Sequence, residues 1–302
     1  MKKKRFILLF IVALISCSKG DEKLPAPISG PHDDEVVVET TNILLDSEFT
    51  GLTGLPEDQG GQHIAKPVTD LLSPLGHYIY TPSGYDDDNM DYPLIVFLHG
   101  GGERGNSFQD ANDLEKVLVH GPPFLIESNR WNPRFPCIVA SPQISSGSWS
   151  PSLVNGFIRH LLRNYRINNT RIYLTGLSMG GRGCWSYVGQ NGNDGFATAM
   201  VPICGSGDPS QVDNLSKVPV WAFHGAEDDV ISAFTQNGSV PMVEAINEND
   251  PLFLAKVTIY PNIGHDSWTQ TYSNTGRGTE SADYSPFDMS IYDWMFQYRK
   301  EE

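Results

Sequence analysis

Short apolar runs recur along the chain between residues 77 and 260, and polar or glycine-rich stretches separate them. The run at 93–98 is apolar throughout, which is typical of a strand buried on both faces in a parallel sheet. Because these runs have strand length and end at turn-forming residues, each is predicted as a strand. The predicted strands are at residues 77–82, 93–98, 136–141, 171–176, 198–204, 218–224 and 255–260.

Apolar residues follow a helical rather than an alternating period in two other stretches. Those between the third and fourth strands are Val154, Phe157, Ile158, Leu161, Leu162 and Tyr165. Their spacing predicts a helix over residues 150–166. Ile291, Trp294, Met295 and Tyr298 predict a closing C-terminal helix in the same way. Strands that alternate with helices indicate an α/β fold, with a mostly parallel central sheet covered by helices on both faces.

The first residues have the pattern of an export signal. Residues 2–5 are basic and residues 6–15 are apolar, a run too short to span a bilayer. The sequence Leu-Ile-Ser-Cys that ends at Cys17 is similar to the lipobox of bacterial lipoprotein precursors. We therefore expect a signal peptide over 1–17, lipidation of Cys17, a flexible tether over 18–34 and a folded domain over 35–302. The expected location is the outer membrane or cell surface, with the periplasm as the alternative.

The sequence Gly-Leu-Ser-Met-Gly-Gly at residues 176–181 lies between a predicted strand and an apolar segment that can continue as a helix. Strand, Gly-x-Ser-x-Gly and helix in this order predict a nucleophile elbow. Side chains at Gly176 and Gly180 would collide with the neighbouring strand and helix, so glycine is expected at both positions. The turn places the hydroxyl of Ser178 above the sheet, at the positive end of the following helix.

A serine nucleophile needs a histidine base and a carboxylate that orients the base. In folds that carry the nucleophile on such an elbow, the chain order is serine, acid, histidine. His265 is the sole histidine after residue 228. Asp228 is the preferred acid because it follows a predicted strand in the pattern His-Gly-x-x-Asp. Three further carboxylates stay open as alternatives, namely Asp229, Glu227 and, more weakly, Asp208.

Attack on a carbonyl also needs N–H donors that meet the developing oxyanion. One expected donor is the backbone N–H of Met179, directly after the nucleophile. The second is expected from the glycine-rich loop that follows the strand at 93–98, with Gly101 preferred and Gly102 next. Glu103 and Arg104 follow in this loop, and we expect them to form an ion pair that holds it.

At this point the sequence resembles a known group. Residues 78–82, 98–105, 120–123, 140–143, the elbow, 223–228 and 264–268 match it in order. The group is that of bacterial α/β-hydrolase esterases similar to dienelactone hydrolases, feruloyl esterases and polyhydroxybutyrate depolymerases, often labelled predicted peptidase or phospholipase/carboxylesterase. The resemblance implies the α/β-hydrolase fold with Ser178, Asp228 and His265 as the triad. It spans about residues 76–299 and is not specific for a substrate. Residues 33–75 match no part of the pattern.

The amino-acid composition limits the classes of molecule that the protein is expected to bind. The chain has 302 residues, 36 acidic and 21 basic, with a net charge of −15. An acidic surface disfavours nucleic acids and anionic membranes, so the expected partner is a small or polymeric ester, with membrane contact only through Cys17. The remaining cysteines, Cys137, Cys184 and Cys204, are expected to be small buried residues, and a Cys184–Cys204 disulfide is left open.

No phosphate loop, dinucleotide fingerprint or metal cluster occurs in the sequence, so no cofactor or metal is expected. The acidic run at 86–91 lacks the spacing of a calcium loop and is interpreted as a solvated turn. Trp268 and Trp149 are candidates for the substrate cleft. The sequence thus predicts a serine esterase that works through an acyl-enzyme, with esters of plant polysaccharides (feruloyl or acetyl) as the expected substrates. A serine peptidase and a non-catalytic binding lipoprotein are the alternatives.

Overall fold

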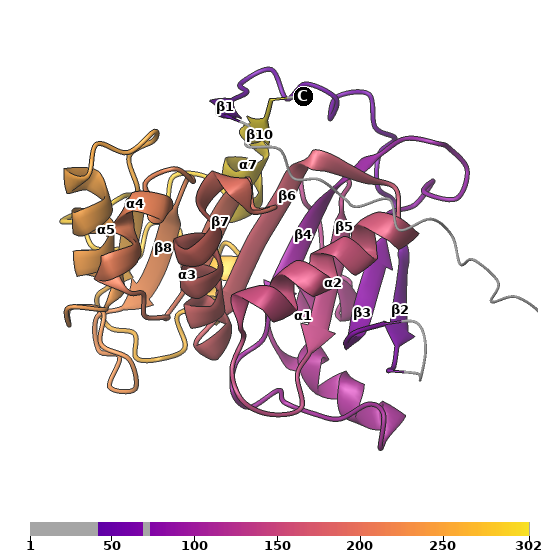
Figure 1. Ribbon diagram of the computed structural model, residues 1–302, viewed down its shortest axis with the longest axis horizontal. Helices are drawn as coiled ribbons and strands as arrows, with labels where there is room; N and C mark the ends of the chain where they lie inside the picture. Colours follow the sequence, from indigo (N-terminus) through magenta and orange to yellow (C-terminus); the bar gives the residue numbers. More distant parts are fainter. Residues whose placement is uncertain (1–41, 69–72, 302) are drawn as a thin grey trace, which may run out of the picture. The chain divides into compact units, whose positions relative to one another are not determined.

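The computed structural model describes residues 42–68 and 73–301 (Figure 1). These residues belong to one compact unit. The expected signal peptide, Cys17 and the tether lie outside the described residues. Within the described ranges, no helix combines the length and apolar character needed to cross a membrane.

A mixed sheet of eight strands forms the centre of the described part of the chain, in the order β2-β3-β5-β4-β6-β7-β8-β9. The strands are β2 (Gln62–Lys66), β3 (Gly76–Thr81), β4 (Tyr92–Leu98), β5 (Ile138–Gln143), β6 (Ile167–Leu177), β7 (Ala199–Ile203), β8 (Trp221–Gly225) and β9 (Lys256–Tyr260). Strands β5, β4, β6, β7, β8 and β9 run parallel, and β2 and β3 join antiparallel at one edge. The predicted, mostly parallel sheet is confirmed.

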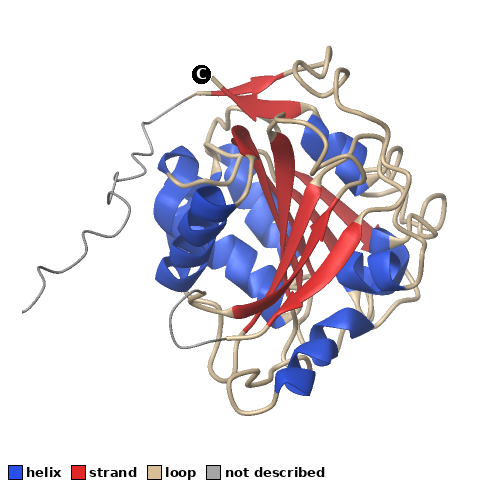
Figure 2. Ribbon diagram, turned by 90° about the vertical axis from the view of Figure 1, so that its right-hand side faces the viewer, coloured by secondary structure: helices blue, strands red, loops and turns tan. Residues whose placement is uncertain are grey.

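Helices lie on both sides of this sheet (Figure 2). They are α1 (Gly121–Glu127), α2 (Pro151–Asn164), α3 (Met179–Asn191), α4 (Val212–Leu215), α5 (Ser239–Glu248), α6 (Trp268–Tyr272) and α7 (Ile291–Phe296), with 3₁₀ helices η1 (Ala111–Val119), η2 (Gly192–Asp194) and η3 (Pro209–Gln211). Helices α2, α3, α4 and α5 contact one another in sequence across the near face in Figure 1, and α1 contacts α6.

Burial follows from this layering. Every residue of β4, β5 and β8 is buried, because helices cover both faces of the parallel strands. Helix α2 buries one stripe, which contains Val154, Phe157, Ile158 and Leu161. Its first turn is fixed by Ser150, whose side chain accepts a hydrogen bond from the N–H of Leu153, and by Pro151 at the first helical position. The predicted helix over residues 150–166 is therefore confirmed as α2, which packs on the sheet.

The C-terminal helix is shorter than the sequence predicts. Helix α7 ends at Phe296, and Tyr298 lies instead in β10 (Tyr298–Lys300). This strand pairs antiparallel with β1 (Ile43–Leu45), which brings both ends of the described chain together. The prediction of a helix through Tyr298 is wrong because pairing with a distant strand replaces helical hydrogen bonds there.

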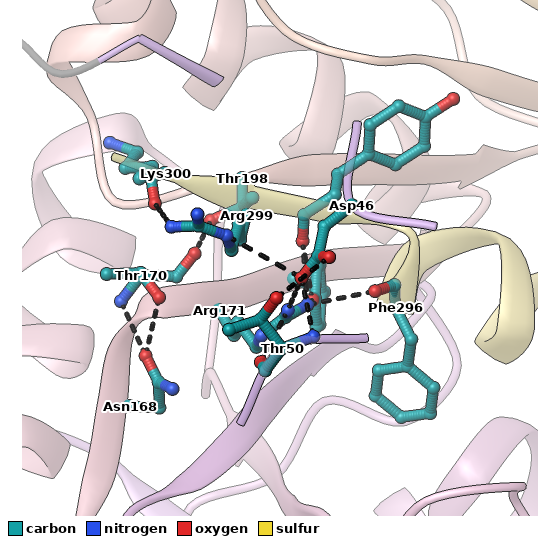
Figure 3. Close-up of polar contacts among 11 residues, drawn as sticks. Asp46, Thr50, Asn168, Thr170, Arg171, Thr198, Phe296, Arg299 and Lys300 are labelled. Atoms are coloured by element: carbon teal, nitrogen blue, oxygen red, sulfur yellow. Dashed lines mark hydrogen bonds and ion pairs between the residues drawn. The ribbon is translucent and has the colours of Figure 1, made fainter. Parts of the chain in front are cut away.

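The segment before β2, which matched no known pattern, is held by a buried arginine of β6 (Figure 3). Arg171 is fully buried, and its guanidinium pairs with the carboxylate of Asp46. It also donates to the carbonyl oxygens of Thr50 at 2.8 Å and Phe296 at 2.9 Å. The guanidinium also donates to the carbonyl oxygen of Tyr298 in β10 at 3.3 Å. Residues near 46–50, the central strand β6 and the C-terminal strand therefore share one polar cluster.

Candidate active site

The turn from β6 to α3 has the geometry of a nucleophile elbow. Ser178 has φ 53° and ψ −114°, a conformation that non-glycine residues rarely adopt. A Cβ atom at Gly180 would lie 1.8 Å from the carbonyl oxygen of Leu98, and one at Gly176 would lie 2.7 Å from that same oxygen. The two glycines thus let the elbow approach the edge of β4, which presents Ser178 at the carboxyl ends of the strands.

Ser178, His265 and Asp228 form a hydrogen-bonded line. The Nε2 atom of His265 lies 2.8 Å from Ser178 Oγ, and its Nδ1 atom lies 2.7 Å from Asp228 Oδ2. Because the carboxylate only accepts hydrogen bonds, Nδ1 carries the proton and Nε2 of the neutral ring is free to accept the serine proton. The structure thus brings together the three residues that the sequence selected, from loops after β6, β8 and β9.

Asp228 lies beneath this line with its side chain fully buried. Burial by itself would raise the pKa of Asp228. Hydrogen bonds from His224, from His265 and from the backbone N–H groups of Ile231 and Val230 outweigh burial and hold that pKa well below its usual range. The carboxylate therefore stays ionised and can stabilise a positive charge on His265.

His224 is a residue of the site to which the sequence did not assign a role. It is the first residue of the His-Gly-x-x-Asp pattern that ends at Asp228. Its ring is fully buried at the end of β8. Nε2 lies 3.1 Å from Asp228 Oδ2 and 2.7 Å from the carbonyl oxygen of Ile231. Both partners are acceptors, so Nε2 carries a proton, and Nδ1 is left to accept from the hydroxyl of Ser239 at 2.8 Å.

The other candidate acids lie elsewhere. Glu227 and Asp229 are exposed to solvent on either side of Asp228. The carboxylate of Asp208 accepts hydrogen bonds from the backbone and side chain of Ser210 at the start of η3. Of these four carboxylates, Asp228 is the one that contacts His265.

One of the two expected oxyanion donors directly follows Ser178, and the other lies in the loop after β4. Met179 is the first residue of α3, so its N–H has no carbonyl partner within that helix. The positive end of the helix dipole lies at the same place, directly after Ser178. Gly101 and Gly102 are exposed in the loop that follows β4. The loop and the helix end together offer backbone N–H groups and favourable electrostatics for a developing negative charge.

Buried groups support the glycine loop from below. His99 accepts a hydrogen bond from the N–H of Ile144 at 3.1 Å through Nε2, and its Nδ1 lies 2.6 Å from the carbonyl oxygen of Gly100. Burial lowers the pKa of His99 to about 4, so the ring is neutral near pH 7. The indole of Trp149 donates to the carbonyl oxygen of His99 at 2.9 Å. Trp149 is 4% exposed, and it supports the loop rather than lining the cleft as the sequence suggested.

The expected ion pair between Glu103 and Arg104 is wrong. Glu103 is buried and lies 3.5 Å from Nε2 of His120. Arg104 turns the other way and donates to the carbonyl oxygens of Gly147 and Gly101. The two side chains hold the loop separately, because neighbouring residues of an irregular loop face different parts of the structure.

Trp268 stands beside the base as one wall of the site. The centroid of its ring lies 5.4 Å from that of His265 and 5.3 Å from that of His120, and the rings meet edge to face in both cases. Trp268 is partly exposed, and His120 has 34% of its side chain exposed. An aromatic surface with an imidazole next to it is therefore open to solvent near Ser178.

Neither a disulfide nor a metal site is found in the part of the chain that the structure describes. Cys184 and Cys204 are free and buried, and Cys204 Sγ accepts a hydrogen bond from the N–H of Ser178 at 3.2 Å. No group of three or more His, Cys, Asp or Glu side chains among the described residues is placed to hold a metal. In the acidic run, Asp88 accepts from the hydroxyl of Tyr92 at 2.7 Å.

Comparison with known sequences finds an esterase. No protein-family model matches the chain. Over 155 residues the chain is 26% identical to a bifunctional acetylxylan esterase/xylanase of Neocallimastix patriciarum. The match covers 51% of this chain and 22% of that protein, so the chain corresponds to about a fifth of the relative's length.

Comparison with solved structures also finds esterases. A thermostable esterase superposes with a TM-score of 0.53 and 27% identity, over 79% of this chain and 63% of the other. A ferulic acid esterase has a TM-score of 0.50 and 14% identity, over 73% and 97% of the two chains. A mutant feruloyl esterase module from Clostridium thermocellum, complexed with sinapinate, has a TM-score of 0.50 and 17% identity, over 85% and 93%. The last two likenesses show the fold alone.

Proposed function

The chain has the α/β-hydrolase fold, and we propose that it is a serine hydrolase that cleaves carboxylic esters. The observation that carries the proposal is the hydrogen-bonded line from Ser178 through His265 to Asp228 at the carboxyl ends of the strands. Such a line activates a hydroxyl that would otherwise be a poor nucleophile near neutral pH.

In the acylation step, Ser178 Oγ attacks the ester carbonyl carbon while its proton moves to Nε2 of His265. The carbonyl electrons move to the oxygen, and the N–H groups of Met179 and Gly101 receive that oxyanion. When the tetrahedral intermediate collapses, the bond to the alcohol breaks and His265 gives its proton to the leaving alcohol. An acyl-enzyme on Ser178 remains.

Deacylation repeats these steps with water. His265 Nε2 takes a proton from water, whose oxygen forms a bond to the acyl carbon, and the same donors hold the oxyanion. Collapse breaks the bond to Ser178 Oγ, which recovers its proton from His265, and the acid leaves. Throughout, ionised Asp228 fixes the Nδ1–H tautomer of His265 and stabilises the imidazolium.

The proposed substrates are esters on plant polysaccharides, with feruloyl or acetyl groups as the acyl part. Support comes from the names of the matched proteins, an acetylxylan esterase among sequences and ferulic acid esterases among structures with the same fold. The open aromatic wall formed by Trp268 suits a planar acyl group or a sugar ring. The peptidase alternative is not favoured, because the matched sequence and the three matched structures described above are esterases.

We also propose that the protein is an exported lipoprotein, attached to the outer membrane or cell surface through Cys17. The proposal rests on the basic and apolar pattern of the first residues and on the lipobox-like sequence. Mass spectrometry of the protein from a bacterial membrane fraction tests it. A lipid-modified Cys17 at the new N-terminus is the expected result. An unmodified Cys17 would contradict it. So would a parent protein that is found in the soluble fraction to the same extent as a Cys17→Ala variant.

A panel of substrates tests the activity and separates the alternatives. The parent and Ser178→Ala would be assayed with p-nitrophenyl acetate, p-nitrophenyl butyrate, methyl ferulate, acetylated xylan and a chromogenic peptide. Turnover of methyl ferulate or acetylated xylan that depends on Ser178 is the expected result. Turnover of the peptide alone would favour a peptidase. No turnover, with Ser178 also unreactive toward a phosphonate, would indicate a binding protein that retains the fold.

A further inference from the structure

One guanidinium touches both residues that are proposed to hold the oxyanion. Arg104 donates through Nη1 to the carbonyl oxygen of Gly101 at 3.3 Å, and its Nη2 lies 2.9 Å from Met179 Sδ. Nε and Nη2 also reach the carbonyl oxygen of Gly147 at 3.0 Å and 2.6 Å. Three segments that are far apart in sequence are therefore tied to one planar group.

The geometry of these contacts suits arginine and no other side chain. The guanidinium is a rigid, planar fork with five N–H donors, so it can satisfy acceptors in several directions at once. Lysine would supply a single ammonium group, which cannot reach all three segments in the same way. The loop that carries Gly101 contains consecutive glycines, and such backbone needs external contacts to keep one conformation.

Among the described residues, no carboxylate forms an ion pair with Arg104. Glu103, its neighbour, faces His120 instead. A positive charge that is held beside the donors of an oxyanion hole favours the negative charge that develops there. Because Arg104 is partly exposed, solvent screens part of this effect.

We propose that Arg104 is a positioning residue of the oxyanion hole, which holds the Gly101 loop against the start of α3 and adds positive potential to the site. This inference rests on the proposed ester hydrolysis. Removing one direct oxyanion donor in another serine hydrolase costs about 10²–10³ in kcat. Arg104 acts through other groups, so a smaller loss is expected, on the order of 10- to 100-fold.

The test compares Arg104→Met and Arg104→Lys with a matched control, Arg166→Met. Arg166 also donates to loop carbonyl oxygens, those of Tyr85 and Met90, and lies 3.9 Å from the carboxylate of Asp88. It precedes β6 at the amino end of that strand, whereas Ser178 follows the carboxyl end. An eleven-residue strand separates the two places by roughly 35 Å. The control therefore measures the cost of losing a guanidinium that ties loops together without a change near the nucleophile.

Titration with a phosphonate gives the concentration of competent sites, so that kcat is expressed per folded site. Arg104→Met is expected to lower kcat on p-nitrophenyl acetate by the stated factor with KM within about twofold, because the contact acts in the transition state. The Ki of an alkyl boronic acid, which forms a negatively charged tetrahedral adduct, should weaken in the same proportion. Arg104→Lys should lie between parent and Arg104→Met, since it restores charge without the fork.

Two results would overturn the inference. One is a kcat per site for Arg104→Met that equals that of Arg166→Met. The other is a loss of kcat with an unchanged Ki for the boronic acid, which would show that the loss does not come from oxyanion binding. Failure of the proposed function looks different, because the parent itself would then neither hydrolyse esters nor react with the phosphonate.

Discussion

His224 and Asp228 are joined inside the core, with His224 Nε2 3.1 Å from Asp228 Oδ2, the oxygen that also meets Nδ1 of His265 at 2.7 Å. One carboxylate oxygen thus lies between two imidazoles, one buried and one at the surface of the site. The other oxygen, Oδ1, accepts from the N–H groups of Val230 and Ile231 at 2.9 Å each. The proposed acid of the triad is therefore fixed from three directions.

Loss of the buried imidazole should weaken catalysis through Asp228. In His224→Ala, the carboxylate loses a donor and gains freedom to move, and kcat should fall on the order of tenfold, which corresponds to about 1.4 kcal/mol. Steady-state kinetics per phosphonate-titrated site provide the measurement. His224→Gln keeps a side-chain N–H that can face Asp228 and should recover part of the loss. Equal kcat values for His224→Ala and the parent would contradict this role.

Asp228→Asn should remove most of the activity while its acidic neighbours do not matter. An amide cannot hold the Nδ1–H tautomer as a carboxylate does, and the equivalent change in another serine hydrolase lowers kcat about 10⁴-fold. Glu227→Gln and Asp229→Asn remove exposed carboxylates on either side and serve as matched controls. Both controls should keep kcat/KM within about twofold of the parent on p-nitrophenyl acetate. A larger loss in Asp229→Asn than in Asp228→Asn would reverse the assignment.

The lowered pKa of Asp228 predicts the direction of acid instability. A carboxyl whose pKa is lower in the folded than in the unfolded protein contributes stability above its unfolded pKa, near about 3.9, and loses that contribution as pH falls toward the folded pKa. Asp228→Asn removes this group. Urea unfolding between about pH 3 and pH 7 should therefore show a shallower acid decline for Asp228→Asn than for the parent. Parallel curves would contradict the shift.

The cluster around Arg171 should matter for stability and not for the site. Asp46→Ala leaves the fully buried guanidinium without its carboxylate, and breaking such a pair typically costs about 3–5 kcal/mol. Asp288→Ala removes the partner of Lys256, an exposed pair, and should cost less than about 1 kcal/mol. Urea unfolding of both variants gives the comparison. Similar losses for the two would show that Asp46 does not hold the N-terminal segment.

The parts of this architecture that sequence predicts are those that depend on local pattern. Uniform apolar runs identify strands such as β4, and the glycines at 176 and 180 mark an elbow because close backbone approach leaves no room for a Cβ. Chain order then leads to His265, and strand ends lead to Asp228. The location of both residues at one edge of the sheet follows from parallel topology.

The parts that sequence does not predict depend on distant partners. Strand β10 exists because Tyr298 pairs with Leu45, which is far away in the chain, so a helical apolar period near the C-terminus extended too far. Trp149 has the composition of a cleft residue, but its indole finds the carbonyl oxygen of His99 in the core. Adjacent opposite charges at 103 and 104 suggest an ion pair, whereas each side chain has a better partner across the fold. Burial and pairing of polar side chains are properties of the assembled layers.

The most direct test of the central claim is to find the atom that becomes covalently modified. The parent and Ser178→Ala would be treated with a fluorophosphonate, digested and analysed by mass spectrometry, with p-nitrophenyl acetate hydrolysis followed in parallel. The account predicts one phosphonyl group on Ser178 in the parent, loss of hydrolysis in step with labelling, and neither reaction in Ser178→Ala. A phosphonyl group on a different residue, or ester hydrolysis by Ser178→Ala within about tenfold of the parent, would contradict it.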